Sequence, residues 1–424
     1  MIAKRFQEKF KFGVSVLRQA NRTNPFVMVY SFISRILCIK KVQLFLIKGT
    51  VKHNNRSTTI LFIGKEKAAR ARANYFADVV FTQIQSLEYL GEFLYRHVTP
   101  SVFKNAEIVV VDANMESTKK LLEKDFLLLP QVHFELDLTR SMSDLINRFS
   151  KRRKRSIKKI KSLNYSYVIF RNNDKFFDFY YWKMYLPYIR RRFGLGAQPC
   201  SYTHSKAFFK KNGGVIFVLN ERRPIAGMLF RVRGKTVDTL NLGVYDGDQK
   251  YLKYCACEAA LFFLIKWAKI KGLRILNYGA TVPFFTNGIF QYKKEWGMVM
   301  EEEEDQIFCA LKVNSFNKNS LSFLLSNPLI FRGKNAIKGV VFVDHRLTKA
   351  ELYKLFSIHL FPKLDSLIVI GYYDRITEEK NEIDFSSNSQ NYSVVLEKEL
   401  LRICSSFLKR GFTVDVFREK AYHN

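Results

Sequence analysis

The sequence predicts an α/β protein built of three units, and three observations support this prediction. Strand patterns and helix patterns alternate along most of the chain. In the middle, three apolar runs with short turns precede a helix that is apolar on almost every side, and then a further strand. Near Asn314 the alternation starts again. Because 424 residues exceed one ordinary domain, we expect units at residues 1–130, 131–313 and 314–424.

The first unit is predicted to be a small α/β region. Residues 26–48 should form a short helix followed by a strand. The strands expected in this unit are Val42–Lys48, Thr58–Gly64 and Ala106–Asp112. Between the last two strands, Lys65–His97 is predicted to be a long helix in which Gly91 is the weak point. Gly64-Lys65 resembles the end of a phosphate loop, but the full motif spacing is absent, which excludes a P-loop.

A strongly basic segment begins the second unit after a strand at Val132–Leu138. Residues 140–224 hold 21 Lys and Arg against 4 Asp and Glu, a net +17 out of +32 for the whole chain. The helix that opens this segment carries one basic stripe, formed by Arg148, Arg152, Arg155 and Lys159. Five consecutive positive charges at Lys151–Arg155 repel one another. They indicate either a solvated face or an anion bound close by.

The rest of the second unit is predicted to be one sheet with a crossover helix. The strands expected are Tyr165–Arg171, Val215–Asn220, Ile225–Val232, Thr236–Val244, Leu273–Tyr278, Met298–Met300 and Ile307–Val313. The helices expected are Asp174–Arg192 with a kink at Pro187, Thr203–Asn212 and Lys250–Lys271. The last helix is apolar on most faces, so it should be buried and should bring Leu273–Tyr278 back parallel to Thr236–Val244.

One stretch after that crossover, Gly272–Gly297, gathers polar and aromatic side chains just past a strand end. They are Asn277, Tyr278, Asn287, Tyr292, Lys293, Lys294 and Trp296. Such a position is where α/β proteins build ligand sites.

The third unit is expected to be a small α/β region of its own. Its predicted strands are Val340–Asp344, Leu367–Ile370 and Thr413–Phe417, its helices Lys349–Leu360 and Val394–Lys409, and its polar loop Phe385–Asn391. The adjacent Asp344 and His345 lack a nucleophile in view, so we interpret them as structural.

Composition narrows the partners and the compartment. The net charge of +32 favours anionic partners, including phosphates, nucleic acid, an acidic carrier or an anionic membrane face. The six scattered cysteines form no disulfide framework, and Cys255 and Cys257 lack a second pair for zinc. No signal peptide is evident, and charges interrupt the apolar segment Pro25–Ile47. We therefore expect a cytoplasmic protein, with peripheral attachment at the inner membrane face as an option.

Three blocks in the middle carry a resemblance to a known family. They are FSKRRKRSIKKI, the strand pair IAGMLF…TLNLGVYD, and ALFFLIKWAKIKGLRILNYGAT followed by FFTNGIFQYKKEWG. In order and spacing, residues 131–312 resemble the GNAT-like acyltransferases of the Fem type and their relatives linked to cell-envelope polysaccharide. The resemblance implies a GNAT-like mixed sheet with flanking helices. Fem-type proteins carry two such halves, so residues 1–130 are open to interpretation as a divergent first half.

The resemblance also implies an activity. Such proteins transfer an acyl or aminoacyl group from a thioester such as acyl-CoA, or from aminoacyl-tRNA, to an amine or hydroxyl. The expected co-substrate is therefore an anionic donor, namely CoA, an acyl carrier or tRNA, with no metal, and the expected setting is cell-envelope or polysaccharide biosynthesis. A splayed strand pair should admit the donor.

The family's motifs map onto particular residues here. Tyr292 stands where GNAT enzymes place a tyrosine that protonates the leaving group, and Lys294 would hold a phosphate. The donor's phosphates would lie at the turn 245–252, helped by Lys250 and Lys253. That turn, GVYDGDQKYL, departs from the usual R/Q-x-x-G-x-G/A by its two acids, a departure that is common in the Fem branch.

The remaining candidates are open between two interpretations. Asn277 and Asn287 either orient substrate or cap turns, and Arg152 and Arg155 either grip phosphates or lie on a solvated face. Asp238 is the candidate general base.

Two other functions compete with acyl transfer. One is a degenerate, non-catalytic GNAT-fold module that binds nucleic acid or an anionic surface. The other is a nucleic-acid enzyme, which is disfavoured because the sequence has no clustered acids of the metal-binding type.

Overall fold

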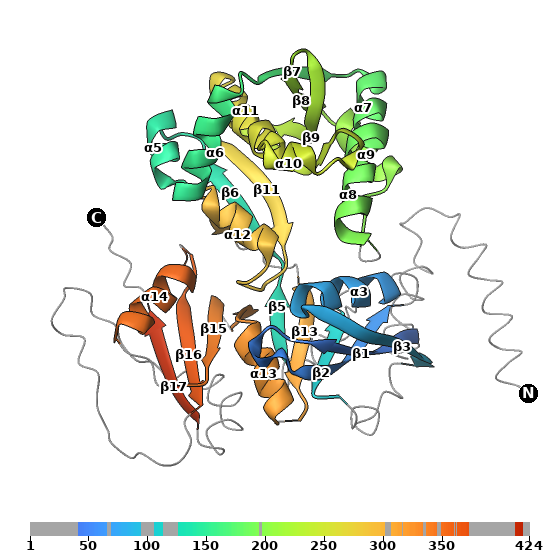
Figure 1. Cartoon of the computed structure of the whole chain (residues 1–424), viewed down its shortest axis with the longest axis vertical. Coiled ribbons are helices and arrows are strands. Elements are labelled where there is room, and N and C mark those ends of the chain that lie inside the picture. The colour runs from blue at the N-terminus through green and yellow to red at the C-terminus, as the bar shows by residue number, and fades with distance from the viewer. Residues whose placement is uncertain are drawn as a thin grey trace, which may run out of the picture.

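The computed structural model describes most of the chain as three sheets with their helices (Figure 1). The described residues are 41–65, 69–94, 106–112, 126–194, 197–301, 307–315, 317–333, 336–345, 349–359, 361, 363–372 and 412–418. The α/β class predicted from the sequence is confirmed. Within the described residues, no helix is both long and apolar enough to cross a membrane.

The first sheet has six strands in the order β3-β1-β2-β4-β13-β5. Its elements are β1 (Lys41–Thr50), β2 (Ser57–Lys65), β3 (Gln83–Leu94), β4 (Ile108–Asp112), β5 (Leu127–Pro130) and β13 (Ile307–Val313), with η1 (His53–Asn55), α3 (Ala69–Val80) and α13 (Lys318–Ser326). Strands β2 and β4 run parallel, and the other pairs are antiparallel. The short helix predicted ahead of Val42 lies outside the described residues.

The long helix predicted at Lys65–His97 is wrong beyond Val80. Residues Gln83–Leu94 form β3, which pairs with β1 along its whole length. The register between the two strands shifts twice, so that Gln85 and Leu90 are extra residues on β3. These bulges break the alternation of apolar and polar residues that would have indicated a strand.

The second sheet has seven strands in the order β12-β6-β11-β10-β9-β8-β7. Its strands are β6 (Val132–Asp137), β7 (Ser166–Arg171), β8 (Gly213–Asn220), β9 (Arg223–Arg233), β10 (Thr236–Val244), β11 (Ile275–Thr281) and β12 (Val299–Glu301). The predicted antiparallel meander β8-β9-β10 and the parallel return of β11 are confirmed.

Helices flank this second sheet in Figure 1. They are α5 (Met142–Arg148), α6 (Lys151–Ser162), α7 (Asp174–Tyr180), the π-helical turn η6 (Tyr181–Tyr185), α8 (Leu186–Phe193), α9 (Tyr202–Lys210), α10 (Lys250–Lys253), α11 (Ala256–Ile270) and α12 (Gly288–Glu295). Helix α11 is buried along most of its length, as its composition predicts. The π turn comes just before Pro187, which has no N–H to donate to the preceding turn.

Strand β13 joins a different sheet from the one we predicted. Its bounds, Ile307–Val313, match the prediction, but it pairs with β4 and β5 of the first sheet instead of closing the second. The chain thus leaves the first sheet between β5 and β6 and returns to it after β12. An apolar strand pattern shows that a segment pairs, but it does not show with which sheet.

The third sheet has four strands in the order β14-β15-β16-β17. Its elements are β14 (Leu329–Arg332), β15 (Ile337–Val343), β16 (Ser366–Tyr372), β17 (Phe412–Arg418) and the helix α14 (Lys349–His359). The predicted strands and the first predicted helix of this C-terminal unit are confirmed. The predicted loop 385–391 and helix 394–409 lie outside the described residues.

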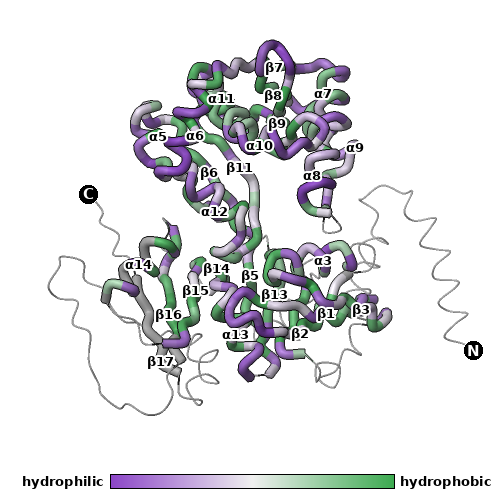
Figure 2. Tube along the Cα trace, in the orientation of Figure 1, coloured by the Kyte–Doolittle hydropathy of each residue, from purple (hydrophilic) through white to green (hydrophobic). Residues whose placement is uncertain are grey.

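Hydrophobic residues follow the inner strands of the sheets, and hydrophilic residues gather on peripheral helices such as α5 (Figure 2). The Asp344-His345 pair lies on the surface, where Asp344 also contacts His53 of η1 at 3.1 Å. That contact joins the first and third units, which supports the structural interpretation of the pair.

A glycine on β10 tests how closely the π turn packs on the sheet. A Cβ at Gly243 would lie 2.5 Å from the carbonyl carbon of Met184. We expect Gly243→Ala to lower the free energy of unfolding by about 1–3 kcal/mol, because the backbone there has to shift. The control is Gly288→Ala at the start of α12, where a Cβ has open space. It should leave stability unchanged or raise it by about 0.5 kcal/mol. Equal melting temperatures for the two variants would contradict this packing.

Candidate active site

The two parallel strands of the second sheet part company. Strand β10 pairs with β11 only through Thr236–Asp238 against Ile275–Asn277. Yet β10 continues to Val244 and β11 to Thr281. Beyond the paired residues, the facing edges of the two strands have no strand between them. Their backbone N–H and C=O groups are therefore available to an extended ligand. This is the splayed strand pair that the resemblance implied.

Each strand carries a bulge at the point of parting. On β10, the register against β9 shifts between Thr239 and Asn241. On β11, the register against β6 shifts between Asn277 and Ala280, where Gly279 has a φ of 71°. Bulges redirect side chains out of the regular alternation. As a result, Asn241 and Tyr278 both line the opening.

A cavity of about 660 Å³ fills this opening. Its walls come from β10 and β11, from η6 and α8, from the first turns of α6 and α11, and from α12. Aromatic and aliphatic side chains such as Tyr188, Ile189 and Phe193 line one side. A cavity of this size, mostly apolar with a few convergent polar groups, is typical of a ligand site.

Three buried polar atoms in this cavity have no hydrogen-bond partner among the described residues. They are Asn241 Nδ2, Tyr278 Oη and Tyr292 Oη. The Tyr180 hydroxyl lies 2.6 Å from Asn241 Oδ1 and donates to it, which fixes the orientation of the Asn241 amide. Leaving a donor buried and unpaired costs about 1–3 kcal/mol. Three such groups around one cavity indicate that a ligand completes them.

Both tyrosines are held protonated. Their rings stack with centroids 6.1 Å apart. Burial raises the pKa of Tyr278 and raises that of Tyr292 well above its ordinary value. Each hydroxyl can therefore donate a hydrogen bond or a proton at neutral pH, and neither can serve as a base.

Lys293 is the second unusual group in the cavity wall. Its side chain is 1 % exposed, and its Nζ donates to the carbonyl oxygens of Gly279 at 2.7 Å and Ala280 at 2.9 Å. The rings of Phe134 and Tyr278 lie within 6 Å of the same nitrogen. Burial lowers the pKa of Lys293 to about 7. Near neutral pH, half of the molecules thus hold a neutral amine. Two N–H groups are committed to carbonyls, so the lone pair is left to accept a proton.

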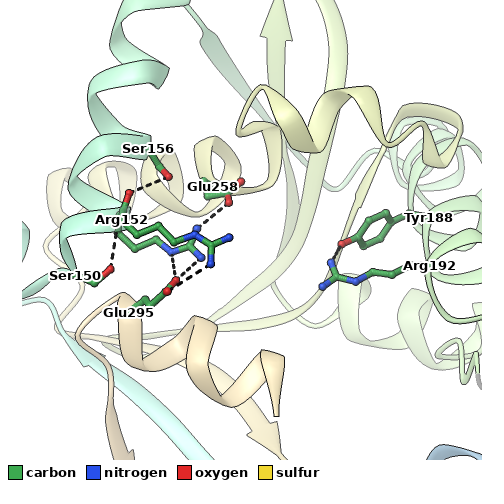
Figure 3. A network of polar contacts seen from close by, with 8 residues as sticks. Ser150, Arg152, Ser156, Tyr188, Arg192, Glu258 and Glu295 are labelled. Atoms are coloured by element: carbon green, nitrogen blue, oxygen red, sulfur yellow. Dashed lines mark hydrogen bonds and ion pairs between the residues drawn. The ribbon is translucent and has the colours of Figure 1, made fainter. Parts of the chain in front are cut away.

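A buried ion cluster closes one end of the cavity. Arg153 contacts Glu258 at 2.8 Å and donates from Nε to Glu295 at 2.8 Å. Its guanidinium also lies 4.5 Å from the ring centre of Tyr292. Figure 3 shows this cluster on one side, with Tyr188 and Arg192 across from it. The cluster fixes Tyr292 from α6 and holds both carboxylates in place.

Some predicted residues lie at this cavity and others do not. Tyr292 and Arg152 line it, and Arg152 lies 3.6 Å from Glu295. Arg155 is exposed elsewhere on α6. Lys250 pairs with Asp248 at 2.9 Å, and Lys253 is exposed on α10; neither lines the cavity.

The two predicted asparagines have structural roles. Asn277 accepts from the N–H of Gly279 at 2.8 Å and so shapes the bulge. Asn287 caps α12 by accepting from the N–H groups of Ile289 and Phe290. The interpretation of both as caps of turns and helices, rather than as substrate ligands, fits this geometry.

Two predicted roles need correction. Asp238 is buried and pairs with Arg231 at 2.9 Å and with Arg233. Burial alone would raise its pKa, but hydrogen bonds from the two arginines outweigh burial and lower it, so Asp238 is a poor base. Lys294 points away from the cavity. It donates to the carbonyl of Ile358 and lies over the ring of Phe361 in the third unit.

The predicted phosphate turn is also not open. Gly247 packs so closely on α8 that a Cβ there would meet the carbonyl oxygen of Pro187 at 2.7 Å. Glu258 occupies the first turn of α11, where the helix would otherwise favour an anion. A phosphate at this helix end would therefore face a carboxylate.

Sequence reasoning missed Lys293, Asn241, Glu258 and Arg153 as cavity residues. For Lys293 a signal exists, because Phe290, Lys293 and Trp296 are three apart, which places this lysine on the apolar face of α12. For Asn241 only the bulge matters, and no pattern in one sequence shows it. Among the described residues, no group of His, Cys, Asp and Glu is arranged to hold a metal. Burial raises the pKa of Cys257, so this thiol in the cavity wall is not activated.

Comparison with known proteins gives similarities of structure only. No family model and no curated protein match the sequence. The crystal structure of FemX is similar with a TM-score of 0.33 and 10% identity, covering 64% of this chain and 88% of that one. The structure of L-PGS from Bacillus licheniformis gives 0.31 and 9%, covering 66% and 88%. A GCN5-related N-acetyltransferase from Sphaerobacter thermophilus gives 0.29 and 10%, covering 50% and 61%.

Similar structures thus include a Fem-type protein and a GCN5-related transferase, the two kinds predicted from the sequence. The meander, the crossover helix and the parted parallel strands form the GNAT-like mixed sheet that was predicted. At these TM-scores the likeness carries nothing about activity, which has to be argued from the cavity itself.

The burial of Lys293 has a consequence for stability. Its pKa is about 7 in the folded protein and near 10.5 when exposed. Between these values the unfolded chain binds more protons, so folding becomes more favourable as pH rises. Relative to Lys293→Met, the native protein should gain on the order of a few kcal/mol between pH 7 and pH 10.

Thermal unfolding of both proteins across this pH range measures the effect. Lys269→Met is the matched control, because Lys269 also donates to two backbone carbonyls, those of Leu138 and Arg140, but is only half-buried. A difference between native protein and Lys293→Met that does not change with pH would show that Lys293 is not a buried, neutralised lysine.

Proposed function

We propose that this protein transfers an acyl or aminoacyl group from an activated donor to an amine or hydroxyl acceptor. The observation that carries the proposal is the cavity between the parted strands β10 and β11, which joins free strand edges, unpaired donors and a lysine of lowered pKa. A donor with an extended, amide-containing arm pairs with the strand edges. Its carbonyl then lies among the unpaired donors.

Each polar group has a chemical role in this proposal. The acceptor's nitrogen or oxygen attacks the donor carbonyl, and neutral Lys293 takes the proton that the acceptor loses. Asn241 Nδ2 and the Tyr278 hydroxyl donate to the oxyanion of the tetrahedral intermediate. The bond to the leaving group then breaks, and Tyr292 gives its proton to the departing sulfur or oxygen. Lys293 returns its proton to the phenolate through the cavity.

The surface of α6 favours a polyanionic donor. Its exposed basic residues are Lys151, Arg152, Arg155, Lys158, Lys159 and Lys161, and the helix carries no acid. Its first turn lines the cavity at Arg152 and Arg153. The closed turn at Gly247 and the carboxylate of Glu258 disfavour the usual seat of a CoA pyrophosphate. We therefore favour aminoacyl-tRNA over acyl-CoA or an acyl carrier as the donor.

The acceptor and the setting remain part of the proposal. An acceptor used in cell-envelope or polysaccharide biosynthesis, on the cytoplasmic side of the membrane, agrees with a cytoplasmic donor. Peripheral attachment to an anionic membrane is compatible with the net charge of +32.

Transfer assays with charged tRNAs and acyl-CoAs test the proposed chemistry. Lys293→Met and Tyr292→Phe should each lower kcat by about 10²–10⁴-fold, the usual contribution of a proton-transferring group. In the native protein, kcat/KM should rise with pH and level off above about pH 7, because neutral Lys293 is the base. Lys250→Met, outside the cavity, is the control and should keep full activity. Full activity in Lys293→Met would remove the proposed mechanism.

Binding of tRNA tests the surface separately. Arg155→Gln with Lys158→Gln should weaken tRNA binding and flatten its dependence on salt by about one logarithmic unit per lost phosphate contact. Lys235→Gln with Lys271→Gln removes the same charge at the other end of α11 from the cavity and should change neither. Equal effects of the two double variants would show only general attraction between a basic protein and RNA.

A second function is favoured by the closed phosphate turn. The chain may be assigned to a degenerate, non-catalytic module that binds an anionic polymer through α6. On that account, tRNA binding depends on Arg155 and Lys158, while no donor is turned over and Lys293→Met binds as well as the native protein.

A further inference from the structure

Helix α12 lies between the second sheet and the C-terminal unit. On one side, Tyr292 and Lys293 form part of the cavity wall. On the other, the helix and the loop before it contact residues that follow β13 in the chain. In Figure 1, α12 lies between β11 above it and β15 and α14 below it.

The loop that leads into α12 is joined to β14 by backbone contacts. Phe284 forms an antiparallel bridge with Leu329. The N–H of Phe285 donates to the carbonyl of Pro328 at 3.0 Å, and the N–H of Ile330 donates to the carbonyl of Pro283 at 2.8 Å. The start of α12 is thus fixed as a short extra strand on the third sheet.

A chain of aromatic contacts runs from the C-terminal unit to Lys293. The ring of Phe361 packs edge-on to Phe290 of α12, with centroids 4.9 Å apart. Phe290 packs edge-on to Phe134 of β6 at 5.1 Å, and Lys293 Nζ lies 5.3 Å from the centre of the Phe134 ring. Phe290 is fully buried and Phe361 is 2 % exposed. Phe361 therefore presses α12 onto the sheet face that buries Lys293.

Lys294 adds a second contact on the same side. Its Nζ donates to the carbonyl of Ile358 and lies 4.5 Å from the centre of the Phe361 ring. Neighbouring residues of α12 thus serve opposite sides, with Lys293 facing the cavity and Lys294 facing the C-terminal unit.

We propose that the C-terminal unit positions α12 for catalysis and that Phe361 is its main positioning residue. The inference about catalysis rests on the proposed acyl transfer, whereas the inference about α12 rests on the contacts alone. Without Phe361 a gap opens beside Phe290, and α12 is free to lift from β6. Water then reaches Lys293, and its amine moves out of line with the acceptor.

The first measurement needs no activity. In protein labelled with ¹³C-lysine, the Lys293 Cε resonance is identified by its absence from Lys293→Met, and its titration is followed by NMR. In Phe361→Ala the midpoint should rise by one pH unit or more, toward the value of an exposed lysine. Phe361→Leu, which keeps most of the contact, should restore the native midpoint.

A matched control separates positioning from general loosening of the third sheet. Phe331 is buried on the opposite face of β14, packed with the first unit, whereas Ile330 and Phe361 pack with the second. Phe331→Ala removes the same volume and should leave the Lys293 midpoint unchanged. Should Phe361→Ala fail to fold, Lys294→Met removes the other contact and should shift the midpoint in the same direction.

Kinetics then connects position to function. Phe361→Ala should lower kcat about tenfold to a hundredfold with little change in KM, because a small displacement of a catalytic group is costly. An unchanged Lys293 midpoint in folded Phe361→Ala, or an equal shift in Phe331→Ala, overturns the positioning role. A shifted midpoint together with unchanged turnover supports positioning of α12 and counts against the proposed function instead.

Discussion

The separation of β10 from β11 is the constraint on which the rest of this site depends. Two strands that stay paired leave no room between them, and two that part leave unpaired backbone groups inside the protein. Bulges in both strands start the separation, and the buried helix α11 holds the strands at their paired end. The cavity, its unpaired donors and the lysine in its wall are all consequences of that geometry.

The surrounding units stabilise what the open strands cannot stabilise themselves. Helix α6 supplies Arg153, which binds Glu258 of α11 and Glu295 of α12 and so ties three walls of the cavity together. The C-terminal unit presses on α12 from behind through Phe361. A buried lysine and three unpaired polar atoms are costly to keep, and this two-sided support is what retains them.

The sequence was sufficient for much of this architecture, because long apolar and alternating patterns decide where helices and strands form. The meander, the crossover helix and the basic helix α6 follow from such patterns, as does the presence of a site near Tyr292. Where bulges interrupt the alternation, the prediction failed at β3 and missed Asn241 on β10. Lys293 and Lys294 are adjacent and chemically alike, and only the packing of α12 decides which one faces the cavity.

The most direct test of this account is a structure with a non-reactive donor, such as an aminoacyl group linked by an amide to a short oligonucleotide that mimics the tRNA end. The account predicts that its amide arm lies between β10 and β11, with the carbonyl oxygen within hydrogen-bond distance of Asn241 Nδ2 and Tyr278 Oη. Binding of this probe elsewhere, with the cavity between the two strands left empty, would contradict the account.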